Sequence, residues 1–273
     1  MTSARIGTRF VIAVALAGAG CAVEDDGADD GAAAQVGEAE QAVSAFGIWS
    51  WGCASGPCAI DLGTATNRTC FLAGVWGNLQ HAGTYSQVDV VRAPNITGQL
   101  RWGLQVVHNG QPLGGTAVCI PGAVAATATW HNGQAEVSLG AGNATRRCFL
   151  SSVRNTNGFT ATSDFVRVRK VGSTWFVGGN QQPGRDVVAS AVCVDVPSTH
   201  AEFGLVVGNG GELLDRPLQD NNPSGWACGL RLIGGHFTAN DFHDGVWLDY
   251  NGGISMWEAN GVNGKSLTAA CVN

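Results

Sequence analysis

Six cysteines fall into three pairs separated by nearly equal lengths of chain, and this spacing constrains the fold more than any other feature. The pairs are Cys70 and Cys119, Cys148 and Cys193, and Cys228 and Cys271, with spacings of 49, 45 and 43 residues. In two pairs the first cysteine opens a Cys-Phe-Leu segment, and in the third it opens Cys-Gly-Leu. The recurrence predicts three copies of one unit, each closed by its own disulfide. The copies cover residues 45–120, 121–194 and 195–273.

Each predicted copy begins with two apolar segments joined by a turn. In the middle copy, residues 127–130 are followed by Asn132-Gly133 and by a second alternating segment that ends at Leu139. Asn-Gly between alternating apolar residues indicates a tight β-hairpin, in which both central residues of the turn adopt positive φ. We therefore expect every copy to open with a hairpin.

Alternating polar and apolar residues follow the first cysteine of each pair, at positions 88–92, 165–169 and 246–250. This period of two is typical of half-buried strands. A second aromatic strand follows, carrying Trp102, Trp175 or Trp257, and the 40 glycines of the chain indicate many turns. No long helical periodicity occurs after residue 44, so the fold class is all-β. Copies of about 70–80 residues can form separate modules or close around a pseudo-threefold axis, and the short links between them favour packed neighbours.

Three further cysteines need partners or another role. Cys53 and Cys58 flank a short Gly-Pro turn, and we expect them to bond to each other. Cys21 is then the ninth and unpaired cysteine. Cysteine is also a metal ligand, but the chain has no pair of Cys-x-x-Cys knuckles, so we expect no metal site. No cofactor-binding motif is present either, and we expect no cofactor.

The N-terminus has the layout of an export signal. Arg5 and Arg9 precede an apolar run at 10–17, and small residues lead to Cys21. This stretch, residues 1–21, resembles a bacterial lipoprotein leader, although Gly18 stands where that pattern prefers leucine. The resemblance implies that Cys21 is lipidated; ordinary secretion with cleavage after Ala22 is the alternative. Setting Cys21 aside leaves eight cysteines, an even number, which favours the lipoprotein.

Residues 22–44 contain seven acids, no Lys or Arg and almost no large apolar residue. Such a composition predicts a disordered linker. Once it is set aside, residues 45–273 hold 14 acids and 13 bases, so the predicted folded part is nearly neutral. Nucleic-acid binding requires clustered cationic charge, and we exclude it as a function.

The third predicted copy contains the densest group of titratable side chains. His236, Asp241, His243 and Asp244 stand within nine residues. Two imidazoles with two carboxylates suit acid–base catalysis, and these four residues are the catalytic candidates for an exported hydrolase. Their spacing matches no known motif, and a solvated turn between strands accounts for them better.

Tryptophans next to turns are candidates for ligand binding, because an exposed indole can stack on a sugar ring. Trp76, Trp226 and Trp247 are the candidates, although most tryptophans of a chain like this one are core residues. The Cys53–Cys58 loop offers a weaker possibility, insertion into a protease as an inhibitor.

These features together favour recognition over catalysis. We expect an exported β protein of the cell envelope, anchored through lipid at Cys21 or else secreted, with a structural or binding role. The expected partners are a glycan or an envelope protein.

Overall fold

The computed structural model describes residues 48–50, 58–79, 86–107, 112–196, 200–206, 216–217, 226–237, 245–251, 256–262 and 264–272. The described residues form strands and turns, without a helix, which confirms the all-β prediction. The eighteen strands fall into three successive sets of six. The first set is β1 (Ile48–Ser50), β2 (Cys58–Thr64), β3 (Arg68–Gly77), β4 (Ser86–Pro94), β5 (Leu100–Val107) and β6 (Leu113–Pro121). The second set is β7 (Val124–His131), β8 (Val137–Ala141), β9 (Arg146–Thr156), β10 (Phe165–Val171), β11 (Thr174–Asn180) and β12 (Asp186–Asp195). The third set is β13 (His200–Val206), β14 (Arg216–Pro217), β15 (Ala227–Gly234), β16 (Gly245–Asn251), β17 (Met256–Gly261) and β18 (Ser266–Val272).

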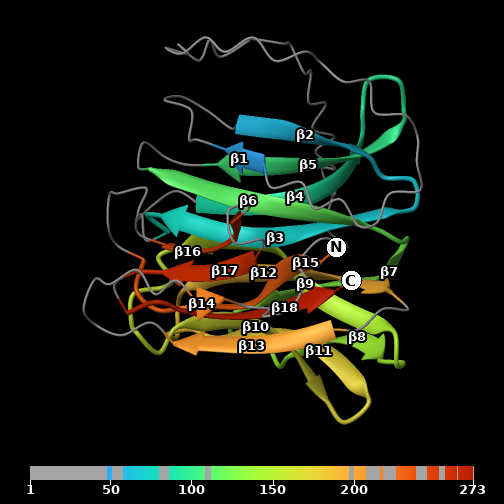
Figure 1. The fold of residues 1–273 in the computed structure, drawn as a ribbon. Helices are drawn as coiled ribbons and strands as arrows, with labels where there is room; N and C mark the ends of the chain where they lie inside the picture. The colour runs from blue at the N-terminus through green and yellow to red at the C-terminus, as the bar shows by residue number, and fades with distance from the viewer. Residues whose placement is uncertain are drawn as a thin grey trace, which may run out of the picture.

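The strands form three six-stranded sheets, and every sheet joins strands from two different sets (Figure 1). The first sheet has the order β1-β6-β3-β16-β17-β14, the second β7-β12-β9-β4-β5-β2, and the third β13-β18-β15-β10-β11-β8. In every sheet the first, sixth and third strands of one set meet the fourth, fifth and second strands of another. Each set therefore contributes three strands to a sheet of another set. The first set contributes to a sheet of the second, the second to a sheet of the third, and the third to a sheet of the first. This common order is the one that three copies of one unit would produce, while the predicted copy boundaries stay a prediction.

The exchange of strands corrects the prediction that each copy opens with a hairpin. β7 pairs with β12 and β8 pairs with β11, so the two strands that flank Asn132-Gly133 lie in different sheets. A turn is present, because the Gln134 N–H donates to the His131 carbonyl at 3.1 Å. Gly133 has a φ of 86°, whereas Asn132 is absent from the residues with positive φ. A turn whose positive φ falls only on its second central residue lacks the twist of a tight hairpin and lets its two arms diverge. β1 and β2 also belong to different sheets, so the prediction is wrong for the first two sets. The returning arm predicted for the third set, residues 212–214, lies outside the described residues.

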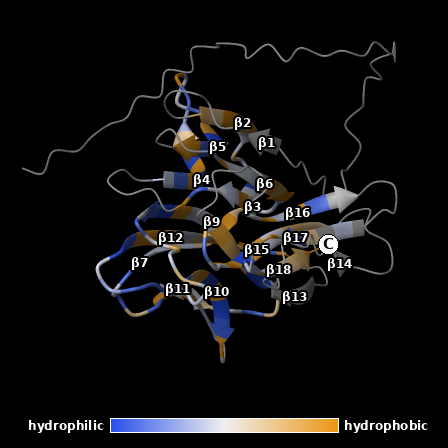
Figure 2. Cartoon of the chain, turned by 90° about the vertical axis from the view of Figure 1, so that its left-hand side faces the viewer, coloured by the Kyte–Doolittle hydropathy of each residue, from blue (hydrophilic) through white to orange (hydrophobic). Residues whose placement is uncertain are grey.

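The centre of the molecule lies where the third strands of the three sets meet. β3, β9 and β15 each pack against the other two, and they occupy the middle of the view in Figure 2. The residue after the first cysteine of each pair faces this centre. Phe71 and Phe149 stack there with ring centroids 4.0 Å apart and ring planes 15° from parallel. Both rings are fully buried.

Gly229 is the third residue of this central layer, and the two phenyl rings leave it no room for a side chain. A Cβ added at Gly229 would lie 2.6 Å from Cδ1 of Phe149 and would overlap the ring of Phe71. The departure from Cys-Phe-Leu to Cys-Gly-Leu in the third set thus has a packing reason. Two rings and one glycine fill the central layer.

The three predicted disulfides between repeated cysteines are confirmed: Cys70–Cys119, Cys148–Cys193 and Cys228–Cys271. Each one joins directly opposite residues of a third and a sixth strand. The chain between the two cysteines holds the fourth and fifth strands, which extend into the neighbouring sheet. Every disulfide thus closes the base of an exchanged hairpin. Cys58 is also disulfide-bonded, and its predicted partner Cys53 lies outside the described residues.

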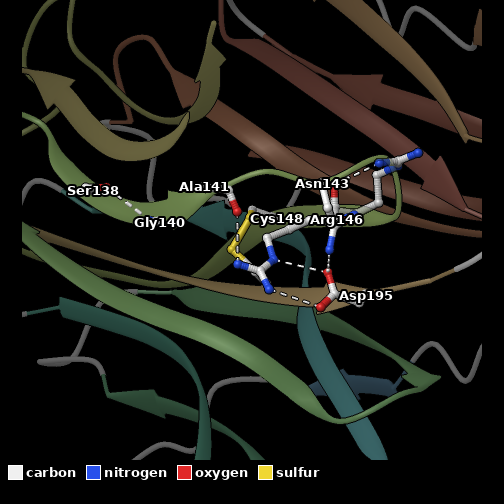
Figure 3. The surroundings of a disulfide bond; sticks show 9 residues. Ser138, Gly140, Ala141, Asn143, Arg146, Cys148 and Asp195 are labelled. Carbon is white, nitrogen blue, oxygen red and sulfur yellow. Dashed lines mark hydrogen bonds and ion pairs between the residues drawn. A yellow bond between two sulfur atoms is a disulfide. The ribbon is translucent and has the colours of Figure 1, made fainter. Parts of the chain in front are cut away.

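Polar side chains surround the Cys148–Cys193 disulfide (Figure 3). Arg146 and Asp195 each lie two residues from a cysteine of this disulfide. They form an ion pair with an Nη2–Oδ2 distance of 3.0 Å. Hydrogen bonds from Arg146 hold the pKa of Asp195 below its ordinary value. The Asn143 carboxamide oxygen accepts hydrogen bonds from the backbone N–H groups of Thr145 and Arg146. The side chain of Asn143 therefore orders the loop that leads into β9.

Candidate binding site

The exchange of strands assembles one polar row across the sheet that contains β4 and β9. The row takes one residue from each of six strands, in the order Ala59, Gln105, Asp89, Ser152, Ser190 and Thr129. Neighbours in this list are directly opposite one another in adjacent strands. Because side chains alternate between the two faces of a strand, opposite residues share a face. We call this set the Asp89 row.

Asp89 is the half-buried carboxylate at the middle of the row. Burial raises its pKa to about 6, against the opposing effects of hydrogen bonds from Gln87 and Ser152 and of the charge of Arg154. The Gln87 amide donates to Oδ2 of Asp89 at 2.6 Å. Farther along the row, the hydroxyl groups of Thr129 and Ser190 are hydrogen-bonded at 2.9 Å. The row thus holds a carboxylate and several hydroxyl groups in a defined arrangement.

A cavity of about 380 Å³ lies beside Asp89, Ser190 and Thr129. It forms where β4 leaves β9, since the pairing of these two strands ends at Asp89 and Ser152. Ser151, the next residue of β9, is the extra residue of a β-bulge and also lines the cavity. Bulges are common beside functional sites because they redirect side chains.

A second, more apolar cavity of about 100 Å³ lies along β5, and Trp102 lines both cavities. Gln105 lines it, and Gln105 is directly opposite Asp89. Its apolar wall includes Ile60, Val91 and Ala93. Gly103 leaves space between the side chains of β2 and β4, because Asp61 and Val91 are its two cross-strand neighbours. The first cavity is thus the more polar of the two, and small-ligand sites combine a largely apolar lining with a few polar groups.

The equivalent position of the other two sheets carries different chemistry. In the sheet of β10 and β15, Arg167 takes the place of Asp89, opposite Leu232. Glu136 pairs with Arg167 at 3.2 Å and with Arg169 at 2.7 Å. Although partial burial acts to raise the pKa of Glu136, hydrogen bonds from Arg169 and Arg167 hold it below its ordinary value. The charge at this position is therefore compensated within the protein.

In the sheet of β3 and β16 the equivalent residue is Trp247, opposite Gly74. Its indole N–H donates to Oδ2 of Asp249 at 2.7 Å. A Cβ on Gly74 would lie 2.8 Å from the Trp247 Cβ, so the glycine makes room for the tryptophan. Trp247 is partly buried, and its role as a ligand-binding residue stays a prediction.

The other two candidate tryptophans lie in the protein interior. Trp76 is 6% exposed and Trp226 is 9% exposed. An interior ring cannot offer a broad face to a sugar, so we do not place a ligand against either residue. A packing role, the alternative that the sequence already suggested, suits both.

The predicted catalytic cluster is described in part. His236 is half-buried at the end of β15, next to the fully buried Phe237. Asp241, His243 and Asp244 lie outside the described residues, so their catalytic role remains a prediction, as does lipidation of Cys21. Among the residues that the structure describes, no three His, Cys, Asp or Glu side chains gather as a metal site requires.

Comparisons with protein-family models, with curated proteins and with solved structures gave no match. No helix in the described part of the chain is long and apolar enough to cross a membrane. Disulfides of this kind form in oxidising compartments, which places the folded protein in an exported environment.

Proposed function

We propose that the protein is an exported binding protein whose ligand is a glycan or another hydroxyl-rich component of the cell envelope. The observation that carries the proposal is Asp89, a half-buried carboxylate beside a cavity and within a row of hydroxyl groups. Sugars present both hydroxyl groups and apolar C–H faces. Carboxylate and hydroxyl oxygens accept hydrogen bonds from sugar hydroxyls, and the apolar wall of the second cavity, along β5, suits a C–H face.

The raised pKa of Asp89 supports a role in binding rather than in stability. A carboxyl group whose pKa is higher in the folded than in the unfolded protein destabilises the fold when it is ionised. Residues that lower stability in this way are common at functional sites. Serine or asparagine in place of Asp89 would fill the row without the loss of stability that an ionised, buried carboxylate causes. A function therefore explains the carboxylate better than packing does.

The proposal includes attachment to the membrane. The lipoprotein-type leader supports lipidation at Cys21, and the acidic linker of residues 22–44 would then separate the anchor from the folded head. Treated as a flexible coil, the linker spans roughly 25–30 Å. Mass spectrometry of the mature N-terminus tests this part: a diacylglycerol-modified Cys21 supports it, and an unmodified N-terminus at position 23 contradicts it.

A glycan array followed by titration tests the binding function. We expect the oxidised protein to bind a defined set of glycans, and we expect Asp89→Asn to weaken that binding at least tenfold, since a buried acceptor contributes about 1–3 kcal/mol. Glu136→Gln is the matched control, because it also converts a half-buried carboxylate to an amide, on a different sheet. It should leave binding unchanged.

The same titration at different pH values sharpens the test. Protonation of Asp89 removes an acceptor, so binding should weaken as the pH falls from 7.5 through about 6. Equal binding by Asp89→Asn and the unsubstituted protein would overturn the proposal, and so would the absence of binding to every glycan and envelope polymer examined.

A further inference from the structure

The exposed large hydrophobic residues of the described chain all lie at two hairpin tips. They are Ile96, which is 86% exposed, Leu100 at 42% and Val171 at 48%. Ile96 and Leu100 belong to the tip of the β4–β5 hairpin, and Val171 belongs to the tip of the β10–β11 hairpin. These two hairpins are equivalent in the topology of the fold. Figure 2 shows the hydrophobic colour at both tips, at the top and at the bottom of the view.

The β4–β5 tip is a closed and well-connected turn. The side-chain oxygen of Asn95 accepts hydrogen bonds from the Thr97 N–H at 3.0 Å and from the Gln99 N–H at 2.9 Å. The Gly98 N–H also donates to the Asn95 carbonyl at 2.9 Å, and Gly98 adopts a φ of 78°. Ile96 is thus presented to solvent by an ordered backbone. Its exposure is therefore a property of the fold.

The first described strand, β1, starts at the same end of the molecule as these tips. β4 runs antiparallel to β9, so its tip points toward the start of β9 and of β7. β7 begins directly after β6 ends at Pro121. Ile48, the first residue of β1, is opposite Ala117 in β6, and β1 runs from there toward Gly115, so the start of β1 lies at the Pro121 end of the pair. Figure 1 agrees, with both hairpin tips on the right-hand side of the molecule.

We propose that the two hairpin tips dock the head onto an anionic lipid surface. The inference uses the proposed anchor at Cys21 for orientation, because a tether that enters at the tip end holds this end toward the membrane. Lys170 is exposed next to Val171 and adds positive charge at the second tip. Apolar side chains flanked by cations are typical of segments that insert into the membrane interface.

A lipid surface fits these tips better than a partner protein does. The tips are separated, one at the top and one at the bottom of Figure 1. A stable protein interface buries about 800 Å² per partner in a continuous patch. A fluid, flat surface instead accepts several small insertions at a distance from one another. The contact is weak on its own, and the tether would strengthen it by raising the effective concentration.

Vesicle partitioning of the full chain carrying Cys21→Ser tests the proposal without the lipid anchor. We expect this protein to bind vesicles of phosphatidylglycerol and phosphatidylcholine, and to bind less as the anionic fraction falls. Ile96→Ser and Val171→Ser should each lower the partition coefficient about tenfold, the value expected for one inserted aliphatic side chain. Lys170→Gln should lower it about fivefold.

Thr162→Ser is the control, because Thr162 is exposed in the loop between β9 and β10, at the opposite end of the molecule. It should leave partitioning unchanged. Equal partitioning of Ile96→Ser and its parent, or no partitioning at high lipid concentration, would overturn the proposal.

Glycan titration of the same variants separates this proposal from the proposed function. Ile96→Ser should keep full glycan binding, and Asp89→Asn should keep full vesicle binding. If the protein binds vesicles through its tips but binds no glycan, the tip docking stands and the glycan function is lost.

Discussion

Two regions of the molecule contain equivalent positions from all three strand sets: the central layer, and the seams between exchanged strands. The two regions differ in whether the residues at these positions contact one another. At the centre the positions hold Phe71, Phe149 and Gly229, which are in mutual contact. At the seams, where a fourth strand joins a third strand of another set, they hold Asp89, Arg167 and Trp247. The seam residues lie on three different sheets.

The two regions differ because the central residues contact one another and the seam residues do not. Three residues that share one closely packed volume cannot change independently, because a larger side chain at one position requires a smaller one at another. Residues on separate sheets have no such coupling. The seams are therefore the place where equivalent positions can acquire separate chemistry, and Asp89 is a seam residue that adjoins a cavity of about 380 Å³.

The largest expected effect comes from breaking the central layer. Gly229→Phe should destabilise the protein by more than about 4 kcal/mol, or prevent folding, because a side chain there overlaps two buried rings. Phe71→Gly combined with Gly229→Phe keeps the number of rings constant and should recover part of the loss. Chemical denaturation of the oxidised proteins measures both effects.

Ala93→Phe is the control for this substitution, since Ala93 is exposed on β4. It adds the same ring outside the core and should change stability by less than about 0.5 kcal/mol. A stable Gly229→Phe protein would show that the central positions are not coupled.

A smaller effect on stability, of opposite sign, is expected from replacing the seam residue Asp89. The pKa of Asp89, about 6 in the fold against an ordinary value of 3.8, means that its contribution to stability declines as the pH rises through this range. Asp89→Asn should therefore raise stability at pH 7 by about 1–3 kcal/mol and have little effect below pH 4. Unfolding curves of both proteins from pH 4 to pH 8 test this. A destabilised Asp89→Asn protein at pH 7 would make the carboxylate structural and weaken the proposed binding site.

The smallest effect on stability is expected at Glu136, which forms ion pairs with Arg167 and Arg169. Glu136 has a lowered pKa, so its contribution is present above about pH 4.5 and disappears as the pH falls through the lower, folded value. Glu136→Gln should reduce stability at pH 7 by about 0.5 kcal/mol, because partly exposed ion pairs contribute little, and added salt should shrink the difference. A loss above about 2 kcal/mol would show that this seam is as constrained as the centre.

Part of the site was accessible from the sequence and part was not. Asp89 lies within the alternating segment 88–92, which forms a half-buried strand as predicted. A carboxylate between valines, where the next copy has Arg167, was a signal that could have singled it out. The partners Ser152, Ser190 and Thr129 were not predictable, because they belong to a different part of the chain and meet Asp89 only through the exchanged pairing.

The sequence by itself determined the strand content and the three repeated disulfides. Alternation is a local property, and the recurrence of cysteines at similar spacing selects one set of pairs among many. Only the tertiary structure decided which strands are neighbours. Backbone hydrogen bonds between strands are the same for every residue type, so a local pattern does not select a partner, and the predicted hairpin at Asn132-Gly133 failed for this reason. Packing around Phe71, Phe149 and Gly229 brings the three sets together, and the resulting exchange of strands assembles the Asp89 row.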